Sequence, residues 1–320
     1  MEKIYDVTAL GEMLIDFAVN GESEQGNQLF EACPGGAPCN VLAMLNKLGR
    51  KTAFIGKVGD DQFGKLLRDT ITNIGIEAKG LVMDQDIHTT LAFVHTFPDG
   101  DREFSFYREP GADMMLKEEE VDYDLIRQSK VFHFGTLSMT DEPVKSATKK
   151  ALAVAKEAGC MITFDPNLRP PLWNSLDEAK EQVLYGLAHC HILKISDNEI
   201  QWLTGEEDYT AGVNWIRERY QIPLILVSMG KEGSRAYYNG MMVEAKPFLQ
   251  KNTIETTGAG DTFCGCSING VLKYGLDNLD EAKLKEILTY ANAGAALITM
   301  KKGAIRSMPE PENIKELIGK

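Results

Sequence analysis

The chain has 320 residues, 43% of them hydrophobic, enough for one large α/β domain or two smaller ones. Its 34 basic and 47 acidic residues give a net charge of −13, which argues against a nucleic-acid or anionic-membrane partner. Six scattered cysteines without a CxxC pair, no apolar run of membrane-spanning length and no signal-peptide pattern predict a cytoplasmic protein with reduced thiols.

Strand and helix patterns alternate along most of the chain. Their alternation predicts an α/β fold with a doubly wound, mostly parallel sheet flanked by helices. We find no repeat, no low-complexity linker and no second domain boundary, so we expect one domain over 1–320. In chain order, the patterns predict strands at 4–10, 52–58, 131–134, 160–164, 191–195 and 224–228, and helices at 38–48, 61–74, 143–158, 211–220, 261–273 and 281–300.

Two segments, 13–33 and 89–107, break this alternation. Apolar and polar residues alternate in them with the period of two that is typical of half-exposed strands. Within the second segment, Pro98-Asp99-Gly100-Asp101 has the composition of a hairpin turn. The two segments therefore predict a small β-sheet apart from the main one, which could serve as a lid.

The most informative stretch is 254–263, which reads IETTGAGDTF. Glycines allow close backbone approach, and a helix start leaves N–H groups unpaired at the positive end of the helix dipole. Gly258, Ala259 and Gly260 therefore predict an anion hole, for which phosphate is the usual ligand. Asp261 at its rim is suited to accept a proton, which suggests phosphoryl transfer to a hydroxyl. A plain glycine-rich turn capped by Asp261 explains these residues equally well.

Two apparent nucleotide-binding motifs are excluded. Residues 59–65 have the spacing of a GxxxxGK phosphate loop, but Leu66 stands where a magnesium-binding hydroxyl is required. Gly258-x-Gly260 resembles the start of a dinucleotide fingerprint, but Phe263 occupies the place of its third glycine.

The motifs that accompany Asp261 decide between its two interpretations. In their order and spacing, the chain resembles the ribokinase-like (PfkB-type) sugar kinases over essentially its whole length. Segments 34–38 and 165–173 look most like fructokinases. The motifs are Gly11-Glu12-Met13-Leu14-Ile15-Asp16, Pro34-Gly35-Gly36-Ala37-Pro38-Cys39-Asn40, Gly56-x-Val58-Gly59-x-Asp61-x-Phe63-Gly64, Asp165-Pro166-Asn167-Leu168-Arg169 and Gly258-Ala259-Gly260-Asp261.

The resemblance implies a ribokinase-like fold and transfer of the ATP γ-phosphoryl group to a primary hydroxyl of a free hexose, with fructose favoured. Asp261 would be the base, and the amides of Gly258, Ala259 and Gly260 would stabilise the transferring group. The acceptor sugar would be held by Asp16, Gly35, Gly36, Asn40 and Arg169, with Arg108 closing over the site from the lid. The alternatives are that Asp16 is a solvated loop residue, that Gly35 and Gly36 form a plain turn and that Asn40 caps a helix. Arg108 and Arg169 would then form surface ion pairs.

For the nucleotide, the resemblance implies ATP with Mg²⁺. Glu199 would organise the magnesium ion through water, and Ser196 stands where asparagine is more usual. Glu255 replaces an aspartate that helps to bind a monovalent cation in relatives, so with Thr257 a K⁺ site could be kept, shifted or lost. The alternatives are that the residues after 228 form a simple hairpin turn and that Asn292 is an exposed residue on a helix. The nucleotide-binding residues implied are Lys194, Ser196, Ser228, Gly230, Gly233, Gly260 and Asn292.

Similar fructokinases pair their lids, which implies a homodimer in which Phe93, Phe104 and Phe106 lie at an apolar interface. Two rival functions stay open. One is a sister kinase for 2-keto-3-deoxygluconate, ribose or a nucleoside, and a keto acid would need Arg108 or Arg169 for its carboxylate. The other is a non-catalytic sugar-binding regulator on the same fold, which the intact motif ending at Asp261 disfavours.

Overall fold

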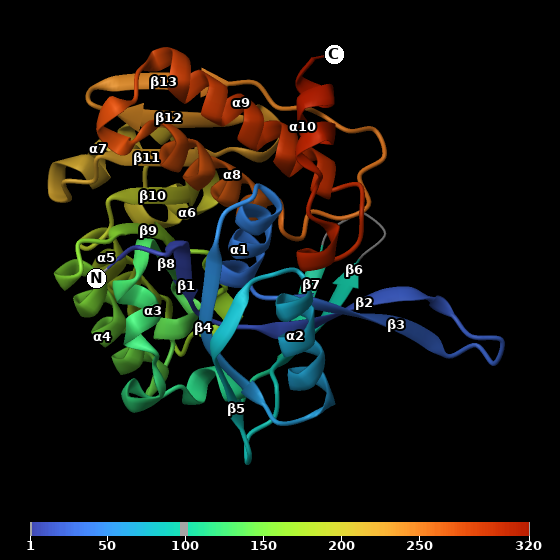
Figure 1. Cartoon of the computed structure of the whole chain (residues 1–320). Coiled ribbons are helices and arrows are strands. Elements are labelled where there is room, and N and C mark those ends of the chain that lie inside the picture. The colour runs from blue at the N-terminus through green and yellow to red at the C-terminus, as the bar shows by residue number, and fades with distance from the viewer. Residues whose placement is uncertain (1, 97–101, 320) are drawn as a thin grey trace.

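The computed structural model describes residues 2–96 and 102–319, with the backbone alone for 95, 96 and 102–104. A large sheet lies between two layers of helices, and a smaller sheet projects from the side of this body (Figure 1). In the described part of the chain, no helix is long and apolar enough to cross a membrane.

The large sheet has nine strands in the order β13-β12-β11-β10-β9-β8-β1-β4-β5. From β11 to β5 all neighbours pair in parallel, and β12 and β13 extend one edge as antiparallel strands. This confirms the doubly wound, mostly parallel sheet, while β5 and β13 were not predicted. The strands are β1 (Tyr5–Leu10), β4 (Thr52–Gly59), β5 (Glu77–Asp84), β8 (Ser129–Gly135), β9 (Met161–Asp165), β10 (Ile192–Ser196), β11 (Leu224–Ser228), β12 (Ser234–Tyr238) and β13 (Met241–Ala245).

Helices cover both faces of this sheet because successive strand residues point to opposite sides. On β11, Leu224 and Leu226 pack in one apolar core, and Ile225 and Val227 pack in the other. The first core includes residues of α1 (Ala37–Lys47), α2 (Gln62–Asn73), α8 (Ala259–Tyr274), α9 (Glu281–Ile298) and α10 (Pro311–Ile318). The second includes residues of α3 (Tyr123–Arg127), α4 (Val144–Glu157), α5 (Leu176–Leu187), α6 (Asp197–Thr204) and α7 (Tyr209–Arg219).

Helices α3, α5, α6 and α10 were not predicted. They are 5, 12, 8 and 8 residues long, and the three shorter helices offer little room for an apolar period to repeat. Their capping signals were nevertheless in the sequence. Ser175 accepts from the Glu178 amide at the start of α5, and Ser196 accepts from the Glu199 amide at the start of α6.

The smaller sheet confirms the separate β-structure expected from 13–33 and 89–107. Its order is β3-β2-β6-β7, and Figure 1 shows the β2–β3 hairpin extending away from the body. The turn predicted at 98–101 lies outside the described residues. The strands, which we call the lid, are β2 (Leu14–Glu22), β3 (Gln28–Gly35), β6 (Leu91–Thr96) and β7 (Arg102–Tyr107).

Aromatic residues of the lid pack against one another and against α2. Phe93 stacks on Phe17 with ring centroids 4.8 Å apart, and Phe17 also meets Phe63 of α2 at 5.5 Å. Phe93 and Phe106 are both half-buried, which fits the half-exposed strands that the sequence predicts. The side chain of Phe104 lies outside the described residues.

Candidate active site

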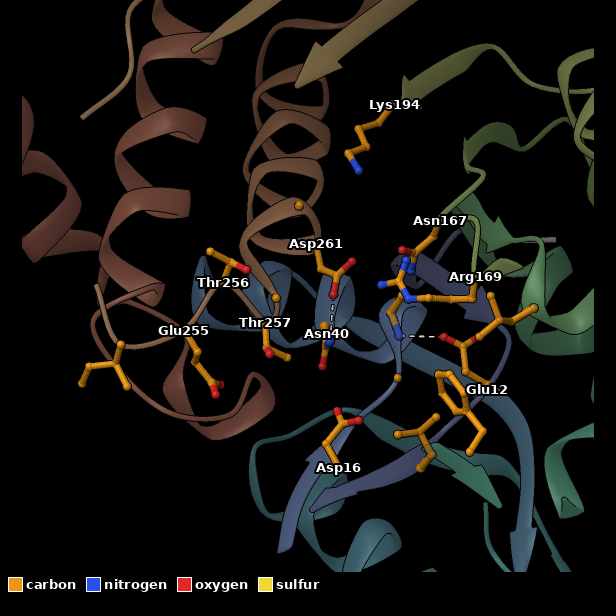
Figure 2. A pocket seen from close by; sticks show the side chains of 18 of the residues that line it. Glu12, Asp16, Asn40, Asn167, Arg169, Lys194, Glu255, Thr256, Thr257 and Asp261 are labelled. Atoms are coloured by element: carbon orange, nitrogen blue, oxygen red, sulfur yellow. Dashed lines mark hydrogen bonds between the residues drawn. The ribbon is translucent and has the colours of Figure 1, made fainter. Parts of the chain in front are cut away.

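A cavity of about 590 Å³ lies between the lid, the starts of α1 and α8, and the carboxyl ends of the parallel strands. Ligands of open α/β sheets bind at this edge of the sheet. Figure 2 shows side chains from these separate elements pointing into it. Of the residues predicted to form the site, the cavity is lined by Asp16, Gly36, Asn40, Arg169, Lys194, Glu255, Thr257, Gly258, Gly260 and Asp261.

Two glycines allow the lid to meet the start of α1. A Cβ on Gly35 would lie 2.6 Å from a carboxylate oxygen of Asp16, and one on Gly36 would lie 2.4 Å from the Glu12 carbonyl oxygen. Gly36 also has φ +122°, which other residues rarely adopt. Glu12 Oε1 accepts from the Ala37 amide at 2.7 Å and so replaces a side-chain cap at this helix start (Figure 2).

Asp261 lies in the first turn of α8 with 9% of its surface exposed. Its Oδ2 accepts a hydrogen bond from Asn40 Nδ2 at 2.8 Å, which joins α8 to α1 across the cavity (Figure 2). Burial raises the pKa of Asp261, and the Asn40 hydrogen bond, Lys194 and Arg169 oppose the rise. A carboxylate with a raised pKa beside a helix start suits a general base that acts near neutral pH.

The glycine-rich turn before Asp261 has the torsions that the sequence predicts. Gly258 has φ +76° and precedes the first residue of α8. The Ala259 amide donates to the Thr256 carbonyl at 3.2 Å, so it is already used within the turn. Of the three amides expected to bind an anion, those of Gly258 and Gly260 belong to residues that line the cavity.

Asp16 enters the cavity from β2, on the lid side (Figure 2). Burial raises the pKa of Asp16 to about 7, with Arg169 opposing the rise and Glu255 and Asp261 adding to it. With Glu12, four acids therefore share this cavity with Arg169, whose Nη1 donates to the carbonyl of Leu168 at 3.1 Å.

Arg108 does not reach the cavity, which corrects the expectation that it contacts the sugar. It is 4% exposed and pairs with the buried Asp113 at 2.7 Å. The same guanidinium donates to Thr140 Oγ1 at 3.0 Å and to the Leu137 carbonyl at 2.9 Å. Arg108 therefore joins the end of β7 to the body of the protein.

Lys194, in the middle of β10, joins this strand to the end of β9 and lies beside the start of α8. Its Nζ pairs with a buried oxygen of Asp165 at 2.9 Å, and a Cβ on Gly260 would lie 3.1 Å from Nζ. Burial raises the pKa of Asp165 to about 7, and Lys194 opposes that rise. A cation is thus held at the point where the anion hole was predicted.

Four of the predicted nucleotide residues lie at neighbouring strand ends or in a turn. Ser196 and Ser228 are paired across β10 and β11. Gly230 and Gly233, with φ +49° and +99°, flank the short turn into β12. The hairpin alternative is therefore correct as local structure, and it does not exclude a binding loop.

Glu199 and Asn292 already have partners inside the protein. Glu199 Oε1 accepts from the Leu168 amide, and Oε2 accepts from the amide and hydroxyl of Ser196, each at 2.8 Å. Asn292 Nδ2 donates to the carbonyls of Ala245 and Lys246 at 3.1 and 3.0 Å. Neither residue lines the cavity, and Asn292 is buried rather than exposed.

Glu255 is partly committed as well, because its Oε1 accepts from the Gly303 amide at 2.6 Å. Both Glu255 and Thr257 line the cavity. Within 2–96 and 102–319, no group of three or more His, Cys, Asp or Glu side chains is placed to hold a metal ion.

Several lining residues were not predicted. Asn167 has φ +46° and lies two residues after β9, and a polar residue just past a parallel strand was the signal that could have identified it. Glu12 carries the same signal after β1. The apolar lining residues had no such signal. The full set not predicted as site residues is Glu12, Leu14, Ala37, Phe106, Leu137, Asn167, Thr253, Ile254 and Thr256.

The chain is similar to known fructokinases in both sequence and fold. The probable fructokinase-4 of Arabidopsis thaliana is 42% identical over 317 residues, which cover 98% of this chain and 96% of the relative. The crystal structure of the Xylella fastidiosa fructokinase with bound ATP superposes with a TM-score of 0.89 at 29% identity, covering 100% of this chain and 99% of that one.

The fructokinase of Vibrio cholerae O395 in a fructose, ADP and calcium ion bound form has a TM-score of 0.89 at 29% identity and covers 99% and 100% of the two chains. A double mutant of that enzyme is known in a fructose, ADP and potassium ion bound form, with a TM-score of 0.87 at 28% identity. The family model described as pfkB family carbohydrate kinase matches residues 5–311. With the sugar-kinase motifs gathered around one cavity, the chain belongs to the pfkB family of carbohydrate kinases.

Proposed function

We propose that this protein transfers the γ-phosphoryl group of ATP to a primary hydroxyl of free fructose. The observation that carries the proposal is the position of Asp261 at the start of α8, in the same cavity as Asp16 and Asn40. A proton acceptor, hydroxyl-binding groups and a helix N-terminus are the parts that phosphoryl transfer to a sugar requires. The fructokinase relatives support fructose as the acceptor.

In the proposed mechanism, the ionised Asp16 accepts hydrogen bonds from the sugar hydroxyls, and Gly36, Asn40 and Arg169 add further contacts. Gly35 contributes by leaving space for the Asp16 carboxylate. The oxygen of the sugar's primary hydroxyl bonds to the γ-phosphorus, and Asp261 accepts the proton of that hydroxyl. The bond from phosphorus to the ADP oxygen breaks at the same time. The amides of Gly258 and Gly260 and the ammonium of Lys194 stabilise charge on the transferring group.

The charge of the cavity favours a neutral sugar over a keto acid. Glu12, Asp16, Glu255 and Asp261 line it, whereas Arg169 and Lys194 are its basic residues, and Lys194 is paired with Asp165. A substrate carboxylate would meet repulsion from these acids. Because Arg108 is paired with Asp113, only Arg169 remains of the two arginines that the 2-keto-3-deoxygluconate alternative offered as the carboxylate's partner.

For the nucleotide, we propose ATP with Mg²⁺ on the side of the cavity toward Ser196, Ser228, Gly230, Gly233 and Asn292. The magnesium ion would screen the triphosphate charge. Glu199 accepts three hydrogen bonds, and a carboxylate offers about four such positions, so it can still hold a metal-bound water. The calcium-bound Vibrio cholerae enzyme supports a divalent ion at the site.

For a monovalent cation, we propose K⁺ beside Glu255 and Thr257. The potassium-bound double mutant of the Vibrio cholerae enzyme supports it. The hydrogen bond from the Gly303 amide uses one Glu255 oxygen, which leaves the other carboxylate oxygen for the ion. Activity in K⁺ salts compared with tetramethylammonium salts tests this assignment, and equal activity in both would contradict it.

We also propose a homodimer formed through the lid. Leu29 and Phe30 on β3 and Tyr107 on β7 are 45%, 36% and 66% exposed, although lid strands belong to a folded sheet. Apolar residues exposed together commonly mark an interface. Sedimentation velocity should show a dimer that Tyr107→Asp dissociates, and a fully active monomer would contradict the proposal.

We further propose that 1–320 forms one kinase domain in the cytoplasm. One family model spans 5–311, and the lid strands come from two separated segments that return to the same body. All six cysteines are free and buried, which fits a reducing compartment.

The experiment that tests the function is a panel of sugars assayed by coupled ADP release. The value of kcat/KM for fructose should exceed those for ribose, adenosine and 2-keto-3-deoxygluconate. A higher value for any of these would replace fructose as the substrate. Sugar binding without ADP release from any member of the panel would favour the non-catalytic regulator.

A further inference from the structure

We propose that Phe106 is a specificity-determining residue whose ring closes the sugar cavity and restricts the acceptor to a free monosaccharide. The inference rests on the proposed fructose kinase activity. It concerns the wall of the cavity on the lid side, away from the phosphoryl-transfer residues.

Phe106 separates three hollow regions of the protein. It lines the sugar cavity of about 590 Å³, and it also lines two outer grooves of about 760 and 610 Å³. Among the described residues, it is the one shared by all three linings. Truncating its side chain would therefore connect the sugar cavity with both grooves.

The lid strands turn Phe106 toward the sugar. In the register of the sheet, Phe106 pairs with Ala92, and Ala92 pairs with Asp16. Paired residues of neighbouring strands project from the same face of a sheet. Phe106 thus lies on the face that carries the sugar-binding Asp16, whereas Phe17 and Phe93 are paired with each other on the opposite face.

Phe106 is held in position because several contacts fix the side chain of the neighbouring Arg108. Its guanidinium pairs with Asp113 and donates to the carbonyl of Leu137, which itself lines the sugar cavity. Asp113 also accepts from the hydroxyl of Thr90, directly before β6. These contacts hold both ends of the β6–β7 hairpin against the body, which assigns Arg108 a positioning role.

The outer groove of about 610 Å³ has the composition of a site for a second sugar unit if Phe106 were removed. Its lining includes Asp141, Asn174 and Trp173, which combine hydrogen-bonding groups with an aromatic ring. In the native chain, Phe106 lines both this groove and the sugar cavity, whereas Asp141, Trp173 and Asn174 line the groove and not the cavity. The same protein should therefore discriminate between fructose and a fructoside that carries a substituent on its anomeric oxygen.

The test compares fructose with sucrose and methyl β-D-fructofuranoside in coupled ADP assays. For the native protein, kcat/KM for sucrose should be at least about 100-fold below that for fructose. Phe106→Ala should shrink this ratio by about 10-fold or more, with kcat/KM for sucrose itself rising. Methyl fructoside, which adds little bulk, should fall between the two acceptors.

Leu14→Ala is the matched control, because Leu14 lines the sugar cavity but neither outer groove. It should lower activity on fructose and sucrose alike and leave their ratio within about 2-fold. If Phe106→Ala destabilises the lid, Phe106→Leu should shift the ratio in the same direction by less, in a protein whose Tm is near native.

Equal losses on all acceptors in Phe106→Ala, or an equal relaxation in Leu14→Ala, would overturn the role of Phe106. Failure of the fructose assignment would look different. If the native protein prefers another sugar, the ratio between that sugar and its glycoside still reports whether Phe106 sets the size limit.

Discussion

The sugar side and the nucleotide side of the cleft are built in contrasting ways. On the sugar side, Asp16 and Asp261 are held in the cavity with raised pKa values, and burial is the main cause for both. On the nucleotide side, Asn292 donates two hydrogen bonds within the protein, and Glu199 uses three of about four acceptor positions there. On the sugar side, buried carboxylates that destabilise the free protein when charged remain available to the substrate. On the nucleotide side, by contrast, Glu199 and Asn292 stabilise the fold.

The largest effect should come from the proton acceptor. Asp261→Asn should lower kcat by about 10²–10⁴-fold, because the amide keeps the shape but cannot take the proton. Fructose and ATP should still bind, which isothermal titration calorimetry can measure. Near-native turnover in this variant would remove Asp261 as the base and weaken the contrast between the two sides.

Truncating Asp16 should act on binding instead of chemistry. Hydrogen bonds to a charged group are worth about 1.5–3 kcal/mol, so Asp16→Ala should raise KM for fructose by about 10–100-fold with a smaller change in kcat. Glu22→Ala, an exposed acid on the same strand, is the control and should leave KM unchanged. If kcat falls as strongly as KM rises, Asp16 acts mainly in the transition state.

On the nucleotide side, substitution should cost stability first. Asn292→Ala removes two hydrogen bonds and leaves the carbonyls of Ala245 and Lys246 without that donor, which should lower the free energy of unfolding by about 1–3 kcal/mol. The exposed Asn198→Ala on α6 should change it by less than about 0.5 kcal/mol. Urea unfolding measures both. A large rise in KM for ATP without lost stability would show that Asn292 serves the nucleotide directly.

On the sugar side, by contrast, removing a charge should stabilise the unliganded protein. The pKa of Asp16 is raised to about 7, so the folded state holds this proton more tightly than the unfolded state does. Stability therefore falls as pH rises from the ordinary value of 3.8 to about 7, and the full cost is present above that range. Asp16→Asn should raise Tm at pH 8 and leave it nearly unchanged at pH 4.

Each kcal/mol relieved by Asp16→Asn should raise Tm by about 1.5 °C, because the entropy of unfolding grows with chain length. The control is Asp60→Asn, because Asp60 is hydrogen-bonded to Lys65 and its pKa is lowered, so this variant should gain nothing at pH 8. Differential scanning calorimetry at both pH values measures the effect. A native or lower Tm for Asp16→Asn at pH 8 would mean that the Asp16 charge carries no cost in the free protein.

The sequence by itself determined the parallel sheet and the separate lid, and most of the residues that it proposed for the sugar site line the cavity. Long strands that are buried on both faces can be recognised from the local sequence. Glycines at close backbone approaches can be recognised in the same way, as at 254–263 and at Gly35-Gly36. The resemblance then linked Asp16, Asn40 and Asp261 into one expected site. Short helices such as α6 and α10 were missed because their apolar faces span too few turns to show a period.

Only the tertiary structure decided which polar groups remain available to a ligand. Arg108 and Arg169 look alike in sequence, yet Arg108 is buried against Asp113, whereas Arg169 faces the sugar cavity. Asp113 lies five residues from Arg108, and Leu137 and Thr140 lie about thirty residues away. No local sequence pattern therefore predicts the contacts of the Arg108 guanidinium. The role of Phe106 follows for the same reason, because the cavities that its ring separates exist only once the lid lies against the body.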